Sequence, residues 1–581
     1  MADPLLALAP RFEAALRAAF GDEHASADPA LRRSDRADYQ ADVAMGLARK
    51  VKRAPRDVAA AIVQHLDLTG ICDKVEIAGP GFINLTFTPA WLAAELSTTL
   101  GDPRLGVAVA SPSETVAIDY SAPNVAKEMH VGNLRSTIIG DALARVLEFL
   151  GHRVIRQNHI GDWGTPFGML IENLIDLGED DSALSVNDLD AFYRQARTKF
   201  DGDPAFADRA RQRVVSLQAG DARTLSLWRR LVDESLRYFG EINGRLGVTL
   251  TPADICGESF YNALLPGVVT ALEEKGLAVE SEGAICVFPP GFTAKDGEPL
   301  PLIVRKQDGG FGYAATDLAA LRHRTGTLGA TRVLYVVGAP QQQHLAMVFA
   351  VARLAGWLAP PARAEHVAFG SVLGPDKKMF KTRSGGTVKL KELLDEAVQR
   401  AASVIAEKNV ELDEATRAEV ARQVGIGAVK YADLSSDRIK DYVFDWDRML
   451  AFEGNTAPYL QYAHARIRSI FRRADLTEAG AADAAAKVAI TLTEPAERAL
   501  ALELLAFGAT ARAVAETLHP HKMCTYLYDL ASRFTSFYEQ CPVLRAEDEA
   551  TRRSRLWLCD LTARTLAQGL TLLGIEAPSR M

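Results

Sequence analysis

The chain has 581 residues, which is too long for one hydrophobic core and predicts roughly three or four domains. Hydrophobic residues make up 48% of the chain and charged residues 24%, as in an ordinary globular protein. The net charge of −8 does not point to a polyanionic partner, but it excludes none, because such binding depends on local patches.

The six cysteines are scattered and contain no C-x-x-C pair, which indicates a reduced, cytoplasmic protein without a disulfide frame. The first residues carry acids and no basic leader, so we expect no signal peptide. No run of about 18 apolar residues occurs, so we expect no contact with a membrane.

Residues 1–108 have the pattern of a small α/β domain. One amphipathic helix is predicted within the first 20 residues and another over PRDVAAAIVQHL. The strand pattern VEIAGPGFINLTF is interrupted at residues 79–81, and the segment GDPRLGVAVASPSE is a plausible linker.

Residues 115–395 are predicted to form a parallel-sheet domain. TVAIDY alternates like a strand, GNLRSTIIGDALARVLEFLG follows as a helix that closes at Gly151, and HRVIRQ restarts a strand. Strand, helix and strand in this order make a βαβ unit and imply a parallel sheet. Over about 180–300, the charged helical patterns DLDAFYRQARTKF and RTLSLWRRLVDESLRYFGEI and then the strand pattern AICVFPP read as an insertion. The apolar run VLYVVGAP then returns to the sheet.

The pattern from residue 396 onward is helical almost throughout, which predicts a connecting region at 396–450 and a helical bundle at 451–581. The predicted fold class is therefore α/β. It comprises a Rossmann-type parallel-sheet domain with an insertion, a small α/β amino-terminal domain and an all-α carboxyl-terminal bundle.

The junction SAPNVAKEMHVGN, residues 121–133, lies between a predicted strand end and a helix start. Unpaired N–H groups and the helix dipole favour an anion there. Pro123 ends the strand, Asn124 tolerates a turn, and Gly132 lets a ligand approach the backbone. Lys127 and His130 add donors, so a nucleotide triphosphate fits. Alternatively, the segment is a polar loop that caps a core helix.

A second basic segment, LGPDKKMFKTRSGGTVKLKELLDEA, starts at Leu373. Such a charge run is usually a solvated face. However, Lys378 and Lys381 flank Met379 and Phe380, so part of this loop should fold against something apolar. A mobile loop that brings two ammonium groups onto polyphosphate suits a reaction with a pyrophosphate leaving group.

Together the two segments closely resemble the class I aminoacyl-tRNA synthetases, whose signatures match P-N-x-A-K-x-x-H-x-G-N-L-R-S-T-x-I-G-D and the K-M-x-K-T loop. NHIGDWGTPFG, FGYAATDLAA, GTVKLKELLDEA, EGNTAPYLQYAHARI and the terminal GLTLLGIEAPSRM resemble the arginyl members specifically, so the resemblance covers essentially the whole chain. The chain departs from the class at Asn133, where histidine is usual, and at Phe380, where serine is common. Asn133 cannot become cationic, so we expect slower activation at most.

The resemblance implies an arginine–tRNA ligase that works on ATP, L-arginine and tRNA(Arg), through arginyl-adenylate. Mg²⁺ should accompany ATP, held mainly by phosphates and water, and nothing demands more than a monomer. The catalytic roles fall on His130, Lys378 and Lys381. The expected ATP-binding residues are Pro123, Lys127, His130, Gly132, Asn133, Lys378 and Lys381.

A guanidinium is best met by a carboxylate that accepts two hydrogen bonds. Tyr313 and Asp317 are four residues apart and share one helix face. On the residues alone, Asp317 would simply complement a helix N-terminus, with Tyr313 half-buried. The resemblance instead implies an arginine pocket of Asp119, Asn124, His159, Tyr313, Asp317 and Gln341.

The segment ARIRSIFRR in the predicted bundle is basic and has Tyr462 and Phe471 nearby. It suits a phosphate backbone and unstacked bases, but equally an ordinary solvated helix. The resemblance implies that the bundle reads the anticodon and that the amino-terminal domain contacts the tRNA elbow. The expected tRNA-binding residues are Tyr462, Arg466, Arg468, Arg472 and Arg473.

The segment HPHKMC offers His519, His521 and Cys524 as metal ligands. Because no fourth ligand lies near in the sequence and an apolar helix begins here, we expect no metal and no protein-bound zinc.

Two other functions are open. Asn133 raises the possibility of a tRNA-binding relative that has lost activity, but retention of Lys381, Asp317, Tyr313 and Gln341 argues against it. The sheet would also suit a nucleotidylyltransferase acting on a small molecule, which would not need the long helical region that follows.

Overall fold

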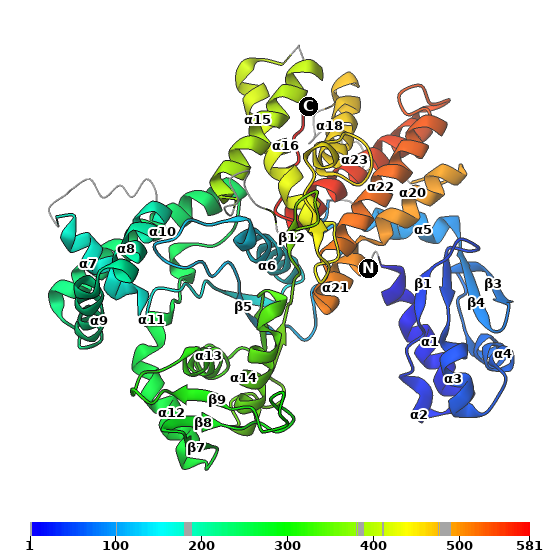
Figure 1. Ribbon diagram of the computed structural model, residues 1–581. Coiled ribbons are helices and arrows are strands. Elements are labelled where there is room, and N and C mark those ends of the chain that lie inside the picture. Colours follow the sequence, from blue (N-terminus) through cyan, green and yellow to red (C-terminus); the bar gives the residue numbers. More distant parts are fainter. Residues whose placement is uncertain are drawn as a thin grey trace.

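The structure is a computed structural model that describes residues 3–99, 101–178, 189–378, 380, 388–408, 412–474, 476 and 490–581 (Figure 1). Within these ranges, no helix combines the length and the apolarity needed to cross a bilayer. The six cysteines are free thiols, and all except Cys72 are buried.

The amino-terminal module pairs a four-stranded antiparallel sheet with helices, and it lies at one side of the molecule (Figure 1). The predicted interruption at residues 79–81 is a hairpin turn, in which a side chain at Gly81 would lie 2.7 Å from the Pro55 carbonyl oxygen. The elements are α1 (Pro4–Phe20), α2 (Asp22–Ala25), β1 (Leu31–Arg33), β2 (Tyr39–Ala41), α3 (Val43–Val51), α4 (Pro55–His65), β3 (Cys72–Ala78), β4 (Phe82–Phe87) and α5 (Pro89–Ser97).

The central sheet has four parallel strands in the order β11-β10-β5-β6. Helix α6 connects β5 to β6, and α14 connects β10 to β11. The chain therefore leaves the neighbouring strands β5 and β10 toward opposite edges of the sheet. The carboxyl ends of strands at such a switch point form the crevice where α/β folds bind ligands. The elements are β5 (Thr115–Asp119), α6 (Val131–Phe149), β6 (Arg153–Gln157), β10 (Arg332–Tyr335), α14 (Gln342–Leu354) and β11 (Arg363–His366).

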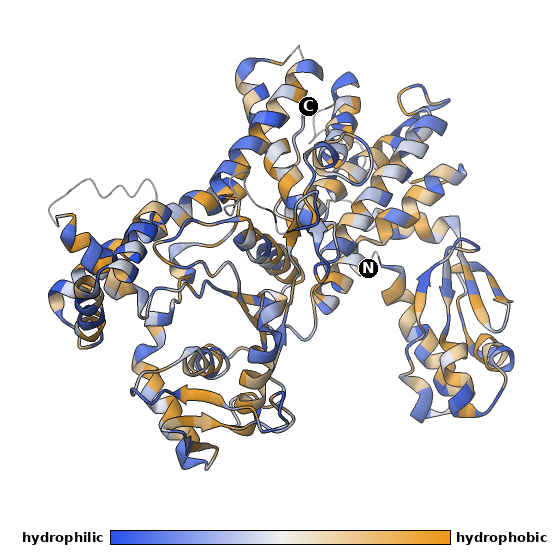
Figure 2. Ribbon diagram, in the orientation of Figure 1, coloured by the Kyte–Doolittle hydropathy of each residue, from blue (hydrophilic) through white to orange (hydrophobic). Residues whose placement is uncertain are grey.

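Successive residues of the central strands belong alternately to two separate hydrophobic cores. Val116 and Ile118 pack with α6, whereas Ala117 and Val333 pack with the core on the opposite face. The sheet is therefore covered on both faces, which explains why β10 is buried at every position. Figure 2 shows the apolar residues that run along α6.

The predicted insertion holds charged helices and a small three-stranded antiparallel sheet of the order β7-β8-β9. The sequence predicted α8, α10 and β8 but not β7 or β9, which are four residues each. The elements are α7 (Pro166–Asp176), α8 (Leu189–Gly202), α9 (Pro204–Gln218), α10 (Ala222–Leu246), α11 (Glu258–Tyr261), α12 (Leu265–Glu274), β7 (Ala278–Ser281), β8 (Ala284–Val287), β9 (Leu302–Arg305) and α13 (Tyr313–Arg322).

Among the described residues that follow, the regular elements are helices apart from one short parallel ladder, β12 with β13. The Ala-rich segment at 479–488 lies outside the described residues. The elements are β12 (Val372–Leu373), α15 (Leu390–Lys408), α16 (Glu414–Leu434), β13 (Tyr442–Val443), α17 (Trp446–Met449), α18 (Ala457–Arg473), α20 (Pro495–Leu505), α21 (Phe507–Thr517), α22 (His521–Gln540) and α23 (Glu549–Leu572).

Helix α6 is tied to its neighbours by two close contacts. Gly140 faces Tyr120, the residue after β5, and any side chain at Gly140 would lie 2.3 Å from the Tyr120 Cβ. Arg135 forms a buried ion pair with Asp433 of α16 at 3.1 Å. The Arg135 guanidinium also lies over the Tyr442 ring, 5.3 Å from its centroid. The sheet and the helical region are thus joined through α6.

Candidate active site

The predicted ligand-binding loops leave the sheet at its switch point. Asp119 and Tyr335 are register partners at the carboxyl ends of β5 and β10. The loop after β5 leads to His130, and the loop after β10 leads to Gln341. Both loops therefore open on the edge of the sheet where the fold predicts a ligand.

Asn133 closes a capping box at the amino end of α6. Its side-chain oxygen accepts a hydrogen bond from the His130 backbone N–H at 3.0 Å. The His130 Nδ1 in turn accepts one from the Gly132 N–H, also at 3.0 Å. The asparagine that departs from the class signature thus has a structural role: it satisfies a donor that the helix start would otherwise leave open.

The electrostatics at this helix start favour a neutral His130. Desolvation by the surrounding atoms lowers its pKa, Lys127 adds to the effect, and Asp190 opposes it. Because Nδ1 accepts a hydrogen bond, a neutral ring carries its proton on Nε2, which can donate to a phosphate oxygen. The Lys127 ammonium lies over the Tyr193 ring, 4.4 Å from its centroid.

The segment that follows the K-M-x-K-T loop contacts the segment that carries the first class signature. The Val131 N–H donates to the Val388 carbonyl at 3.1 Å, and the Leu390 N–H donates to the Met129 carbonyl at 2.8 Å. The Lys389 ammonium also pairs with Glu128 at 2.8 Å. These contacts bring segments more than 250 positions apart to the amino end of α6.

The beginning of the same loop is fixed by β12 and by an aromatic contact. The Phe380 N–H donates to the Val372 carbonyl at 3.1 Å, and its ring stacks on Phe444 at 4.7 Å between centroids. The apolar part of the loop therefore packs against the fold, as expected. Lys378 is exposed, and Lys381 lies outside the described residues, so its contact with nucleotide stays a prediction.

The predicted arginine pocket differs from the simpler interpretation of its residues. Tyr313 is 76% exposed, not half-buried. Asp317 lies beyond the first turn of α13, so it does not complement the helix N-terminus. Its carboxylate instead pairs with the His344 Nε2 at 2.6 Å, which raises the pKa of His344. Gln341 is exposed just before α14, the helix that carries His344.

Sequence reasoning missed an acid beside this pocket. Burial, together with the charges of Asp162 and Asp317, raises the pKa of Glu258 to about 7. A carboxyl group surrounded by acids is stabilised by a cation, so Glu258 extends a pocket that suits a guanidinium. The stretch GESFY carries no periodicity that could have revealed it.

A buried layer lies beneath the pocket. Asp119 pairs with Arg324 at 2.8 Å, and both side chains are almost fully buried. The Arg324 Nε and Nη1 have no hydrogen-bond partner among the residues that the structure describes. Because Arg324 already neutralises Asp119, a direct contact of this carboxylate with a substrate amino group stays a prediction.

The remaining loop residues of the predicted pocket support one another. The segment at Asn124 pairs with Gly161, and the Gly161 N–H donates to the Pro123 carbonyl at 3.1 Å. The His159 ring lies 5.5 Å from that of Tyr261 between centroids. The loop after β5 is thereby held against the loop after β6.

The basic helix α18 only partly matches the predicted RNA surface. Tyr462, Arg466 and Arg473 are exposed, but Phe471 is 2% exposed and belongs to the core. Arg468 pairs with Asp560 at 3.3 Å and is largely buried. The expectation of bases stacking on Phe471 is therefore wrong, because this ring faces the bundle.

The Arg472 Nη1 donates to the Ser579 carbonyl at 3.0 Å, although the side chain is exposed. This residue thus helps to hold the carboxyl-terminal segment on α18.

Comparisons with known proteins agree with this geometry. Three family descriptions match: "Arginyl tRNA synthetase N terminal domain" at residues 7–87, "tRNA synthetases class I (R), catalytic domain" at 95–446, and "DALR anticodon binding domain" at 460–581. Arginine–tRNA ligase of Thermobifida fusca is 59% identical over 100% of both chains. The chain belongs to the arginyl-tRNA synthetase family. The enzyme named arginine–tRNA ligase in Cellvibrio japonicus is 57% identical, over 94% of each chain.

Solved structures of the arginyl-tRNA synthetase family share the fold. The enzyme of Plasmodium falciparum has a TM-score of 0.85 at 28% identity, with 98% of each chain covered. That of Thermus thermophilus has a TM-score of 0.82 at 26% identity, covering 98% of this chain and 99% of that one. The α/β fold class and the resemblance drawn from the sequence are thereby confirmed.

The capping role of Asn133 can be separated from any role at the nucleotide. Asn133→Ala should destabilise the protein by about 1 kcal/mol, because it removes one hydrogen bond at the helix start. Asn133→Asp keeps the acceptor and should retain stability, but its charge should raise the KM for ATP. Urea unfolding and steady-state kinetics measure the two effects. Equal stability of Asn133→Ala and the unaltered protein would contradict the capping role.

Proposed function

We infer that this chain is an arginine–tRNA ligase. It activates arginine with ATP to arginyl-adenylate, and it transfers the arginyl group to the 3′-terminal adenosine of tRNA(Arg), releasing AMP and pyrophosphate. The observation that carries this function is the pairing of residues 129–131 with residues 388–390. It supports one site at which both signature segments act on one ATP.

In the first step, the arginine carboxylate attacks the α-phosphorus of ATP and pyrophosphate leaves. No protein nucleophile is needed, so the residues contribute positioning and charge stabilisation. The amino end of α6, with Pro123, Gly132 and Asn133, receives the nucleotide. His130 donates from Nε2 to a phosphate oxygen, while Lys378 and Lys381 stabilise the negative charge that develops on pyrophosphate. ATP enters as its Mg²⁺ complex, held mainly by phosphates and water.

Arginine is selected by the acids beside α13. The Asp317 carboxylate accepts hydrogen bonds from the guanidinium, while Tyr313 and Gln341 complete its polar surroundings. Glu258 adds a second negative charge. Lysine is rejected because a round ammonium leaves carboxylate lone pairs and the Tyr313 hydroxyl unpaired.

His344 holds Asp317 in place through the hydrogen bond that joins them. Asp119, Asn124 and His159 face the amino acid backbone end of the pocket. The buried Asp119–Arg324 ion pair lies beneath this part of the site. We therefore propose that Asp119 and Arg324 act together in positioning the amino acid.

The second step brings in tRNA. A ribose hydroxyl of the terminal adenosine attacks the mixed anhydride, and AMP leaves. The helical region at 451–581 reads the anticodon, and the exposed residues Tyr462, Arg466, Arg472 and Arg473 contact the RNA. Arg468, paired with Asp560, supports this surface from beneath.

The amino-terminal domain at 1–108 contacts the tRNA elbow, and residues 396–450 connect the catalytic domain at 115–395 to the bundle. We place the enzyme in the cytoplasm, because the six free thiols suit a reducing compartment. We also propose that it acts as a monomer.

Exchange of labelled pyrophosphate into ATP tests the function directly. The assay should give exchange with arginine, and much stronger exchange when tRNA(Arg) is present. Each of the other standard amino acids serves as a control. An equal response to lysine, or none with any amino acid, would contradict the assignment.

Arginine binding should strengthen as pH rises, because a cation prefers the ionised form of Glu258. With its pKa at about 7, Glu258 is about one-tenth ionised at roughly pH 6 and about nine-tenths ionised at roughly pH 8, so the Kd for arginine should fall about tenfold. Calorimetric titration measures this slope.

The Glu258→Gln variant should bind arginine more weakly, and its Kd should change much less with pH. The pH dependence that remains comes from the Asp317–His344 pair. Glu280→Gln, at an exposed position of β7, is the matched control. A Kd that does not change with pH in the unaltered protein would exclude this role of Glu258.

A further inference from the structure

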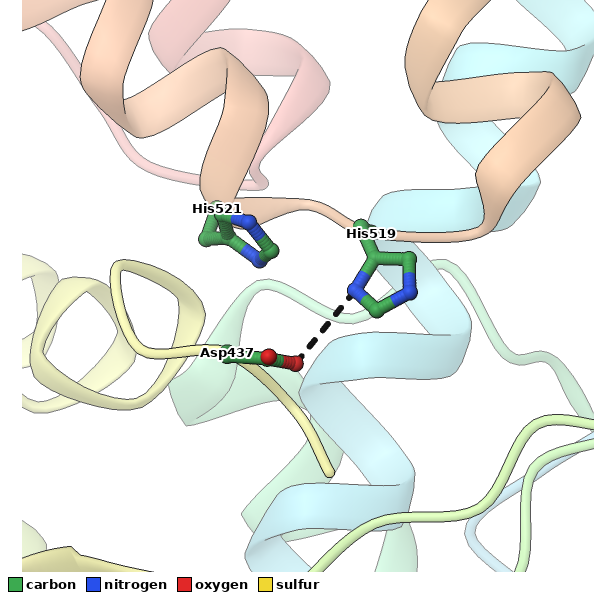
Figure 3. Close-up of side chains that lie close together, drawn as sticks. All are labelled: Asp437, His519 and His521. Carbon is green, nitrogen blue, oxygen red and sulfur yellow. Dashed lines mark ion pairs between the residues drawn. The ribbon is translucent and has the colours of Figure 1, made fainter. Parts of the chain in front are cut away.

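Two histidines and an aspartate from distant segments converge away from the candidate active site. His519 and His521 flank Pro520 in the turn from α21 to α22, and Asp437 lies in the segment between α16 and β13 (Figure 3). One possible ligand atom from each residue lies within 4.8 Å of the other two. Asp437 is remote in the chain from the two histidines, so no local pattern could have placed it beside them.

The backbone around the cluster is held in place by the neighbour of Asp437. The Arg438 Nε donates to the carbonyl of Leu518, the residue before His519, at 2.7 Å. Its Nη1 donates to the Ala368 carbonyl, and its own carbonyl accepts from the Gly370 N–H. The Asp437 segment and the histidine turn are therefore fixed relative to one another without help from the cluster.

One pair of atoms in the cluster is spaced as two ligands of a single ion would be. The Nδ1 atoms of both histidines are buried, and neither has a hydrogen-bond partner among the described residues. The His519 Nδ1 lies 3.4 Å from the Asp437 Oδ1, which is long for a charge-assisted hydrogen bond. Two atoms bound tetrahedrally to one Zn²⁺ at about 2.0–2.1 Å are about 3.3–3.4 Å apart. The observed separation fits a shared ion better than a direct bond.

We propose that Asp437, His519 and His521 bind one divalent transition-metal ion, Zn²⁺ foremost, with water completing the coordination. Two imidazoles and one carboxylate form a ligand set that favours Zn²⁺ over Mg²⁺ or Ca²⁺, which take oxygen ligands. Cys524 of the same sequence segment is not a ligand, because it is fully buried in the core around α22.

The position of the cluster gives the ion a structural role. Asp437 precedes β13, which pairs with β12 at the base of the signature loop. His519 lies in the turn before α22 of the helical bundle, and His521 is the first residue of that helix. A bound ion would therefore join the bundle to the segment that supports the loop. Burial lowers the pKa of both imidazoles, and the charges of Arg438 and Lys522 add to this effect. The same two charges should also moderate the affinity for a cation.

Metal titration of the full-length, untagged protein tests this site. After treatment with a chelator, Co²⁺ should bind at one equivalent and give the intense visible bands of a low-symmetry tetrahedral site, which Zn²⁺ should then remove. His519→Gln and Asp437→Asn should each weaken binding by more than the roughly 10–100-fold that loss of an outer hydrogen-bond partner causes. His65→Gln, at an exposed position of α4, should bind like the unaltered protein.

Thermal unfolding with and without Zn²⁺ gives a second measure that does not depend on activity. Zn²⁺ should raise the Tm of the unaltered protein and of His65→Gln, and should leave the Tm of Asp437→Asn unchanged. Asp437→Asn has nearly the same shape as the native side chain, so it should remain folded without metal. Absence of Co²⁺ bands, or equal binding by all variants, would show an Asp–His ion pair only and overturn the proposal.

Discussion

The candidate active site depends on one backbone contact, the pairing of Met129–Val131 with Val388–Leu390. The first segment forms the amino end of α6, and the second ends the lysine loop and begins α15. Without this contact the loop would have no fixed relation to the edge of the sheet. With it, the loop that carries Lys378 and Lys381 is anchored at its far end beside the proposed nucleotide site at the helix start. Because effective positioning can account for a large part of a barrier, this constraint matters more than any single side chain.

The same contact links the catalytic sheet to the helical part of the chain. The loop begins on the β12–β13 ladder, where Phe380 stacks on Phe444, and the buried Arg135–Asp433 pair joins α6 to α16 close by. Removing one partner of such a buried pair is far more costly than the pair is worth, since it leaves an unpaired charge. Sheet, loop and bundle are thus connected through short, buried contacts, which offers a path by which tRNA held by the bundle can influence activation.

The sequence predicted those helices and strands whose position depends on the local spacing of apolar and turn residues. The β5–α6–β6 unit, its end at Gly151 and the return to the sheet at β10 follow from apolar spacing and turn residues. Strands β1 (LRR) and β7 (AVES) were not predicted, because each contains too few apolar residues to form a strand pattern. Helix α18 was predicted as a basic helix, but which side faces the bundle depends on tertiary packing, so the sequence could not show that Phe471 belongs to the core.

The site was predictable only in part for the same reason. The signature segments could be read from the chain, but Glu258, His344 and Arg324 act through partners brought by the fold. Asn133 shows a subtler limit: its departure from the class pattern suggested an effect on rate, whereas its geometry shows a cap on α6.

A double-mutant cycle of His130→Ala and Lys381→Ala, measured by the rate of ATP–pyrophosphate exchange, tests most directly whether both signatures act on one ATP. If they do, the two changes should be coupled, and the loss in the double variant should differ from the sum of the single losses by more than about 1 kcal/mol. Losses that add to within about 0.3–0.5 kcal/mol would mean that the two residues act independently, and would contradict a shared site.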